Sequence, residues 1–239
     1  MPALASRAMS QPDPVLGAPH YTASPTLSFC ILGETVIVLD IETDRYFALG
    51  PRRGEQILAN LAGKEENPRP HVPGTALTGD RFAGAVYVDR HQFELPTRDY
   101  SSSSKHGALV LAKERWRATC LYLAALVIVK FGGFARSLRW ATLRAKSGSA
   151  VRRAQAEAVI DAHRWARSLL PFNGTCLPAS LALVRGLAGV GAPYVLVVGV
   201  KLGPFAAHCW VEDGGAVLND DLETVRQFTP IRFVRDAAP

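Results

Sequence analysis

Short apolar runs separated by turn residues follow one another through residues 26–49. The segments LSFCILG, ETVIVLD and DRYFALG are rich in β-branched and aromatic residues, as strands are. Gly33 and Glu34, and then Thr43 and Asp44, lie where hairpin turns are expected. Pro51 opens the segment PRRGEQILANLAG, whose apolar residues recur at helical spacing. The pattern predicts three short strands followed by a helix.

The last third of the chain follows a different pattern. The segment VRRAQAEAVIDAHRWARSLL has apolar residues at helical spacing, which predicts a helix. FNGTCLPASLALVRGLAGVG predicts another helix that begins at Cys176, because Thr175 is a suitable N-cap and Pro178 falls in the first turn. PYVLVVGVKLG predicts a strand and AAHCWVEDGGAVLND a hairpin. This mixture of strands and helices places the chain in the α+β class.

The most hydrophobic stretch is CLYLAALVIV, residues 120–129. Lys130, Gly132 and Gly133 interrupt it directly afterwards. A helix needs about 20 apolar residues to cross a bilayer, so this run is too short. It predicts a buried helix, and we do not expect the protein to associate with a membrane.

Composition and charge narrow the choice of function. The 239 residues, 48% of them apolar, indicate a globular protein of one large or two small domains. A net charge of +6 permits an anionic partner without requiring one. The basic residues of segment 130–167 lack the aromatic residues of nucleic-acid sites, so we expect no nucleic-acid partner. Four widely spaced cysteines and the lack of a signal-like segment at the N-terminus favour the cytoplasm.

Cys176 is the first candidate for chemistry. At the first position of a helix, the helix dipole and the free backbone N–H groups favour a thiolate. The same groups, including the backbone N–H of Cys176, are suited to hold an oxyanion when an acyl group is attacked. A lone cysteine is also commonly a small core residue, so Cys176 needs partners to count as a nucleophile.

His208 and Cys209 are neighbours, but strand geometry separates their side chains. Alternate residues of a strand share a face, so His208, Trp210 and Glu212 point one way while Cys209 and Val211 point the other. Cys209 therefore cannot readily reach the imidazole. For the same reason a metal site built from Cys176, His208 and Cys209 is disfavoured, and we expect no metal or cofactor.

The turn of the hairpin decides which side chain faces His208. A three-residue loop of Asp213, Gly214 and Gly215 would set His208 opposite Asp220. A carboxylate there would orient the imidazole and stabilise its charged form. A two-residue turn of Asp213 and Gly214 would set it opposite Asn219 instead. Asp221 is the second candidate for the carboxylate.

CLPASLAL, YVLVVGVKLGPFAAHCWVEDGG, LND and FTPI, taken in this order, resemble the lasso-peptide B proteins over residues 159–233. Members of that family are leader peptidases with a transglutaminase-like, papain-like thiol protease fold and an antiparallel sheet. The resemblance implies that Cys176 is the nucleophile, His208 the general base and acid, and Asp220 the orienting residue. Cys209 departs from the family pattern, which usually has Ala there.

The same resemblance implies a substrate and a partner. The substrate would be a ribosomally made lasso precursor peptide, cut between its leader and its core. The freed N-terminal amine of the core would then be joined into a macrolactam by a partner cyclase related to asparagine synthetase. The protein would thus be a thiol protease of peptide-antibiotic biosynthesis.

The N-terminal strands and helix resemble the precursor-recognition element, a small winged-helix-like domain that binds the leader as an added strand. By this resemblance, the leader-binding residues are Arg45, Tyr46, Phe47, Ala48 and Leu49. The expected organisation is a flexible tail over 1–20, a recognition domain over 21–95, a linker over 96–107 and a peptidase domain over 108–239.

Two other functions remain open at this point. One is a non-catalytic peptide-binding or scaffold protein, in which Cys176 and the hairpin are structural. The other is a transglutaminase-like acyl transferase or deamidase, because formation of an acyl-enzyme is common to these reactions and to proteolysis.

Overall fold

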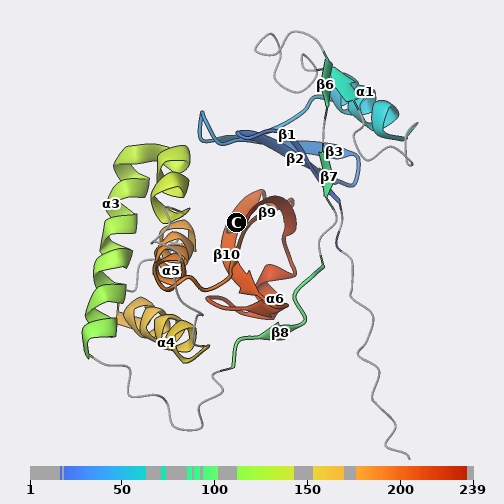
Figure 1. Cartoon of the computed structure of the whole chain (residues 1–239). Coiled ribbons are helices and arrows are strands. Elements are labelled where there is room, and N and C mark those ends of the chain that lie inside the picture. Colours follow the sequence, from blue (N-terminus) through green and yellow to red (C-terminus); the bar gives the residue numbers. More distant parts are fainter. Residues whose placement is uncertain are drawn as a thin grey trace, which may run out of the picture.

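A computed structural model of the chain describes residues 17, 19–62, 71–73, 85–87, 89–91, 94–101, 112–142, 153–169 and 176–235. Most of the expected tail, the serine-rich part of the expected linker and Thr175 with its predicted N-cap role lie outside these ranges. The described parts have the predicted α+β composition, with two five-stranded sheets and several helices (Figure 1).

The first sheet is antiparallel in its described pairs and has the strand order β4-β3-β2-β1-β7. Its strands are β1 (His20–Ser24), β2 (Leu27–Leu32), β3 (Thr35–Asp40), β4 (Arg45–Ala48) and β7 (Asp89–His91). Helix α1 (Pro51–Ala62) follows β4, and β5 (His71–Pro73) pairs separately with β6 (Ala85–Tyr87). The three predicted strands and the helix are confirmed, whereas β1 was not predicted. The winged-helix arrangement stays a prediction.

The second sheet has the order β12-β9-β10-β11-β8. Its strands are β8 (Arg98–Asp99), β9 (Val195–Lys201), β10 (Ala206–Asp213), β11 (Ala216–Val217) and β12 (Thr229–Arg235). The helices of this part are α3 (Ala112–Thr142), α4 (Arg153–Leu169), α5 (Cys176–Val190) and the short α6 (Leu222–Val225). β8 lies inside the segment expected to be a linker, and it pairs in parallel with β11. That part of the segment therefore belongs to the second sheet.

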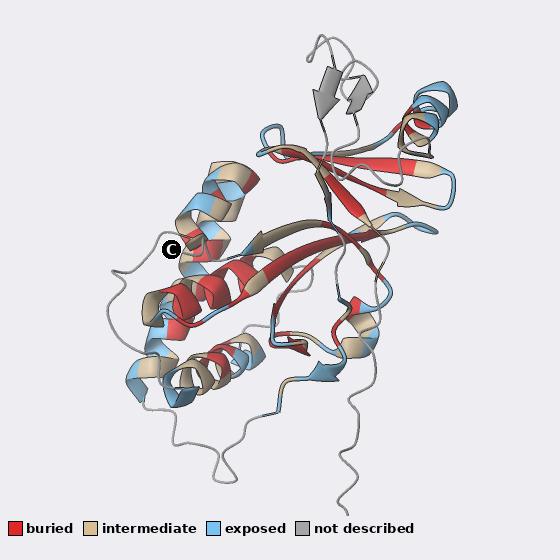
Figure 2. Cartoon of the chain, turned by 45° about the vertical axis from the view of Figure 1, so that its right-hand side comes forward, coloured by how far each residue is buried: buried red, intermediate tan, exposed pale blue. Residues whose placement is uncertain are grey.

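Helix α5 occupies the centre of this part of the molecule. Ten of its fifteen residues are buried, because it packs against α3 and α4 on one side and β10 on the other. Figure 2 shows the buried residues concentrated along this helix and the neighbouring strands. The apolar composition of α5 follows from this position, since a helix covered on all sides has no polar face.

The first sheet is apolar on both faces, as strand alternation allows. Phe29, Val36 and Val38 pack with Ile57 of α1 on one face. The intervening residues Cys30, Ile37 and Leu39 belong to the same buried cluster as Leu181 and Val198 of α5 and β9. The sheet is thus a layer between α1 and the second sheet, and both parts of the chain share one core.

Polar contacts hold the same junction. The guanidinium of Arg232, on β12, donates to the carbonyl oxygens of Ser24 at 3.4 Å and of Pro25 at 2.7 Å. The ring of His20 lies 4.4 Å from that of Phe233, measured between centroids. Strand β1 and the turn that follows it are therefore fixed against β12 by both hydrogen bonds and ring packing.

Helix α3 differs from the expectation of a buried helix. Tyr122 and Ala125 are buried, but Leu123 is 46% exposed and Val127 is 56% exposed. A kink at Gly133, whose φ is 70°, divides the helix near its C-terminal third. By length and hydropathy it is the one helix among the described residues that could cross a membrane, with 22% of its most apolar stretch buried. The prediction holds for one face of the helix and is wrong for the other.

Candidate active site

Cys176 is the first residue of α5, as predicted, and is half-buried. Burial by itself raises the pKa of its thiol. The hydrogen bond and the charge of His208, with the backbone N–H groups of Cys209 and Leu177, outweigh burial and hold the pKa below its ordinary value. The start of α5 is therefore an environment that favours a thiolate.

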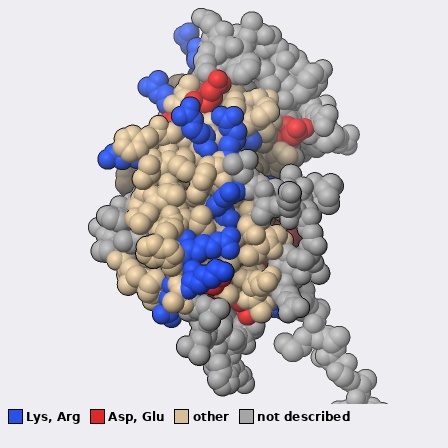
Figure 3. All heavy atoms as spheres, turned by 60° about the vertical axis from the view of Figure 1, so that its left-hand side comes forward, with Lys and Arg blue, Asp and Glu red and all other residues tan. Residues whose placement is uncertain are grey.

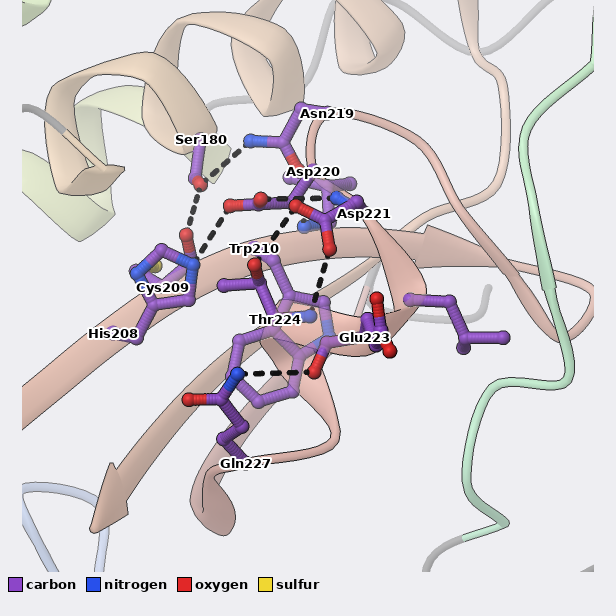
Figure 4. Close-up of polar contacts among 12 residues, drawn as sticks. Ser180, His208, Cys209, Trp210, Asn219, Asp220, Asp221, Glu223, Thr224 and Gln227 are labelled. Atoms are coloured by element: carbon purple, nitrogen blue, oxygen red, sulfur yellow. Dashed lines mark hydrogen bonds and ion pairs between the residues drawn. The ribbon is translucent and has the colours of Figure 1, made fainter.

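His208 lies on β10 between a thiol and a carboxylate. Its Nε2 is 2.7 Å from Oδ2 of Asp220, so Nδ1 is the nitrogen left for the hydrogen bond with Cys176 (Figure 4). Burial alone would lower the pKa of the imidazole. The hydrogen bonds to Asp220 and Cys176 reverse this effect and raise the pKa to about 9. At neutral pH the arrangement favours an imidazolium paired with a thiolate.

Two aromatic rings pack around this imidazole. Its centroid lies 4.9 Å from that of Phe228 and 6.0 Å from that of Trp210. Gly199, which pairs with His208 across the ladder, leaves room for them, because a Cβ there would lie 2.8 Å from the Trp210 ring and 2.9 Å from Cβ of Phe228. Glycine at position 199 therefore allows both rings to pack around the imidazole.

The hairpin register differs from both expected forms. The turn consists of Gly214 and Gly215, with φ of 52° and 75°, and Asp213 pairs with Ala216. Only glycine adopts two such angles at little cost. Both expected loops are therefore wrong, because each included Asp213 in the turn. With this register, continued pairing would set His208 opposite Asp221.

Asp220 nevertheless meets His208, because the chain leaves the ladder beforehand. The N–H of Leu218 still donates to the carbonyl of Val211, at 2.9 Å. The side chain of Asn219 then takes the place of the next strand residue and accepts from the N–H of Val211 at 2.8 Å. This turn of the backbone brings the Asp220 carboxylate to the imidazole.

Asp221 has a different partner. Its carboxylate caps α6 and accepts from the N–H and the hydroxyl of Thr224, both at 2.8 Å. The N–H of Asp221 donates to Oδ1 of Asp220 at 3.0 Å. Burial tends to raise the pKa of Asp220, but the bond with His208, this N–H and the charge of Arg167 lower it. Asp220 is thus the carboxylate that faces the imidazole.

The part of the chain that contains these residues is similar to known proteins. Residues 119–233, which contain Cys176, His208 and Asp220, match the family model of the Transglutaminase-like superfamily. We call this part of the chain the transglutaminase-like domain because of this match. A stretch of 49 residues is 47% identical to the Microcin J25-processing protein McjB of Escherichia coli, and covers 20% of this chain and 24% of that protein. No solved structure matches the chain. The two matches confirm the resemblance to lasso-peptide B proteins.

A buried polar pair, not predicted from the sequence, ties the transglutaminase-like domain together around its site. The hydroxyl of Ser180 donates to the carbonyl of Cys209 at 2.8 Å and accepts from the amide of Asn219 at 2.9 Å. Arg167 of α4 donates to the backbone carbonyl of Asn219. Ser180 lies one turn after Cys176, so a hydroxyl within the apolar run that precedes Arg185 was the available signal.

The predicted leader-binding strand is the outer strand of the first sheet among the described residues. Arg45 and Ala48 are exposed, Phe47 packs toward α1, and Leu49 is buried. Tyr46 faces the shared core, with its ring 5.8 Å from that of Phe205, and burial raises its pKa. Tyr46 is near enough to Cys209 and Cys176 for their charges to raise its pKa further, and it shares its face of the strand with Ala48.

We expect alkylation by iodoacetamide to single out Cys176 once exposed Cys120 is changed to Ser. Cys30 and Cys209 are buried, and burial raises the pKa of both thiols. Because its pKa is lowered, the alkylation rate of Cys176 should reach its plateau at a lower pH than that of an ordinary thiol. His208→Ala should slow the reaction at pH 7 by about tenfold or more, because the thiolate loses its cation. Mass spectrometry of the alkylated peptides gives the rates, and an ordinary thiol titration for Cys176 would contradict this account.

Ser180→Ala should destabilise the protein, because it leaves the carbonyl of Cys209 and the amide of Asn219 without their partner. The expected loss is about 1–3 kcal/mol in the free energy of unfolding. Ser137→Ala is the matched control, since Ser137 is equally buried but bonds only the Gly133 carbonyl of its own helix, at 2.6 Å. Urea unfolding measures both. Equal losses in the two variants would show that Ser180 ties no elements together.

Proposed function

We propose that the protein is a cysteine peptidase that cuts a lasso precursor peptide between leader and core. The observation that carries the proposal is the position of His208, which bonds the Asp220 carboxylate at 2.7 Å and a thiol of lowered pKa on its other side. A nucleophile, a base within hydrogen-bond reach and a group that orients the base are what covalent acyl transfer requires. The resemblance to lasso-peptide B proteins supports the choice of substrate.

In the proposed reaction, the Cys176 thiolate attacks the carbonyl carbon of the scissile peptide bond. Backbone N–H groups at the start of α5, including that of Cys176, stabilise the oxyanion. The His208 imidazolium gives its proton to the leaving nitrogen, which departs as the N-terminal amine of the core. His208 then takes a proton from water, whose oxygen attacks the thioester and releases the leader with a free carboxylate. Asp220 keeps the imidazole oriented throughout.

The product explains the proposed partner. A core peptide with a free N-terminal amine carries the nucleophile needed for a macrolactam. We therefore propose that the core passes to an asparagine-synthetase-like cyclase, and that both proteins act in the cytoplasm. A lasso precursor is the proposed ligand of the first sheet as well as of the active site.

The test is cleavage of a precursor peptide by the full chain, followed by mass spectrometry. A peptidase yields a leader fragment and a core fragment with a new N-terminus. A deamidase or an acyl transferase would leave the chain uncut at that junction and change a side chain instead. Cys176→Ala should bind the precursor without cutting it, and retained cutting would exclude Cys176 as nucleophile.

Exchange of each aspartate for asparagine separates the two carboxylates. Asp220→Asn should lower turnover by roughly a hundredfold, because the imidazole loses its orienting acceptor. Since Asp220 raises the pKa of His208, the fall in kcat/KM on the alkaline side should move from about pH 9 to a lower pH. Asp221→Asn is the control, because asparagine caps a helix as well as aspartate does. Damage by Asp221→Asn alone would reverse the assignment.

We further propose that the leader pairs with the edge of β4 that has no partner strand among the described residues. The N–H of Leu49 donates to the carbonyl of Val36. Hydrogen-bonding direction alternates along a strand, so the N–H and C=O groups of Tyr46 and Ala48 face away from β3. A peptide strand added there would lie beside Tyr46, which connects this edge with the region of the catalytic residues.

Ala48→Pro removes one donor from this edge and no bond with β3. Leader affinity should fall by about tenfold, the contribution of one hydrogen bond. Ala48→Ser, which keeps the N–H, should bind normally. Titration of a leader peptide into the full-length Cys176→Ala protein measures both, because a fragment of the first sheet would expose Cys30, Ile37 and Leu39. Equal affinity in the two variants would exclude pairing at Ala48.

A further inference from the structure

The outer face of α3 is apolar and uncovered among the described residues. Trp116, Leu123, Val127 and Phe131 are 72%, 46%, 56% and 75% exposed, and Cys120 is exposed among them. Their spacing along the helix places them on one side of it. From the first to the last they extend over about 22 Å, at 1.5 Å per residue. We call these five residues the α3 stripe.

The opposite face of α3 is fixed to the protein. Tyr122 and Ala125 are buried in the core, and the helix packs against both α4 and α5. Because this face is part of the folded domain, the helix lies along the surface of the molecule and cannot leave it to cross a bilayer. A partner of the stripe must therefore approach it from the side that faces away from α4 and α5.

The exposed charges of α3 have one sign. The exposed charged residues of α3 are all basic: Lys113, Arg117, Lys130, Arg136 and Arg139. Glu114 is the acidic residue of this helix, and it is less exposed. Figure 3 shows Lys and Arg side chains along this side of the molecule, with few acidic ones among them. The complementary partner is anionic.

The stripe has almost nothing to offer in hydrogen bonding. Its exposed members between residues 118 and 129 are Cys120, Leu123 and Val127, which carry no strong donor or acceptor. A protein that covered the stripe would be expected to form roughly one hydrogen bond for every 100–200 Å² of interface. Hydrocarbon chains need none. An apolar helix face bordered by Trp and Lys or Arg is the pattern of a helix that lies in a membrane surface.

We propose that the α3 stripe docks on an anionic lipid surface. The apolar side chains enter the outer part of the acyl layer, and Lys113 and Lys130 contact the headgroups. Lys130 already lies over the Phe131 ring, with Nζ 5.5 Å from the centroid, so its ammonium group can reach outward while the ring inserts. The protein would work as a peripheral membrane protein, a property independent of whether it cleaves a peptide.

The test is sedimentation of the full chain with vesicles. Vesicles of phosphatidylglycerol and phosphatidylcholine should carry the protein down. Vesicles of phosphatidylcholine alone should carry about tenfold less, because they lack the anionic headgroups that attract basic side chains. High salt should weaken binding to the anionic vesicles. Failure to sediment with anionic vesicles at low salt would overturn the proposal.

A pair of polar substitutions localises the contact. Val127→Gln with Phe131→Gln should lower vesicle binding by at least about tenfold, because two inserted side chains are lost. Leu169→Gln with Leu202→Gln is the matched control, since these leucines are 54% and 45% exposed but lie outside α3. Both double variants replace exposed residues, so circular dichroism should show the fold retained. Equal binding by the two double variants would overturn the assignment to α3.

Lys113→Gln with Lys130→Gln tests the electrostatic part and should remove most of the preference for phosphatidylglycerol. Size-exclusion chromatography tests the remaining alternative, which is that a second copy of the chain covers the stripe. If the wild-type chain is a dimer that Val127→Gln with Phe131→Gln dissociates, and it does not bind vesicles, a second copy covers the stripe and the proposal is wrong.

Discussion

The hydroxyl of Ser180 is the contact on which the geometry of the site depends. It joins α5 to the backbone of β10 and to the side chain of Asn219. Cys176, His208 and Asp220 each lie within four residues of one of these three points. Inside a protein a satisfied polar contact is strong and an unsatisfied one is costly, so this pair of bonds tolerates little displacement. The reacting groups are held by neighbours that take no part in the chemistry.

Sequence patterns predicted those parts of the protein that local rules decide. The opposite facing of His208 and Cys209 follows from strand alternation, and the structure has it, with Cys209 buried in the core. The start of α5 at Cys176 followed from its helix signals. The B-protein resemblance, confirmed by the family match and by the similarity to McjB, came from motifs carried by the same segments.

The features that the sequence patterns did not predict have one cause in common. They depend on contacts between residues that are far apart in the sequence. Asp220 was the right partner for His208, but the hairpin turn differs and an excursion of the backbone at Asn219 brings the carboxylate in. No rule based on residue spacing predicts this departure of the backbone from the strand ladder. Helix α3 was expected to be buried because its residues are apolar, yet apolar composition does not say how many neighbours a helix has. Ser180 and Gly199 matter through contacts with residues far away in the sequence.

Among the described residues, both faces of the first sheet are covered by other parts of the protein. One side is covered by α1, and the other contributes Cys30, Ile37 and Leu39 to the core of the transglutaminase-like domain. Such a layer cannot be detached, exchanged for that of a relative or shortened without opening the interior of its neighbour. A substitution at Cys30, Ile37 or Leu39 would therefore alter the packing of both parts at once.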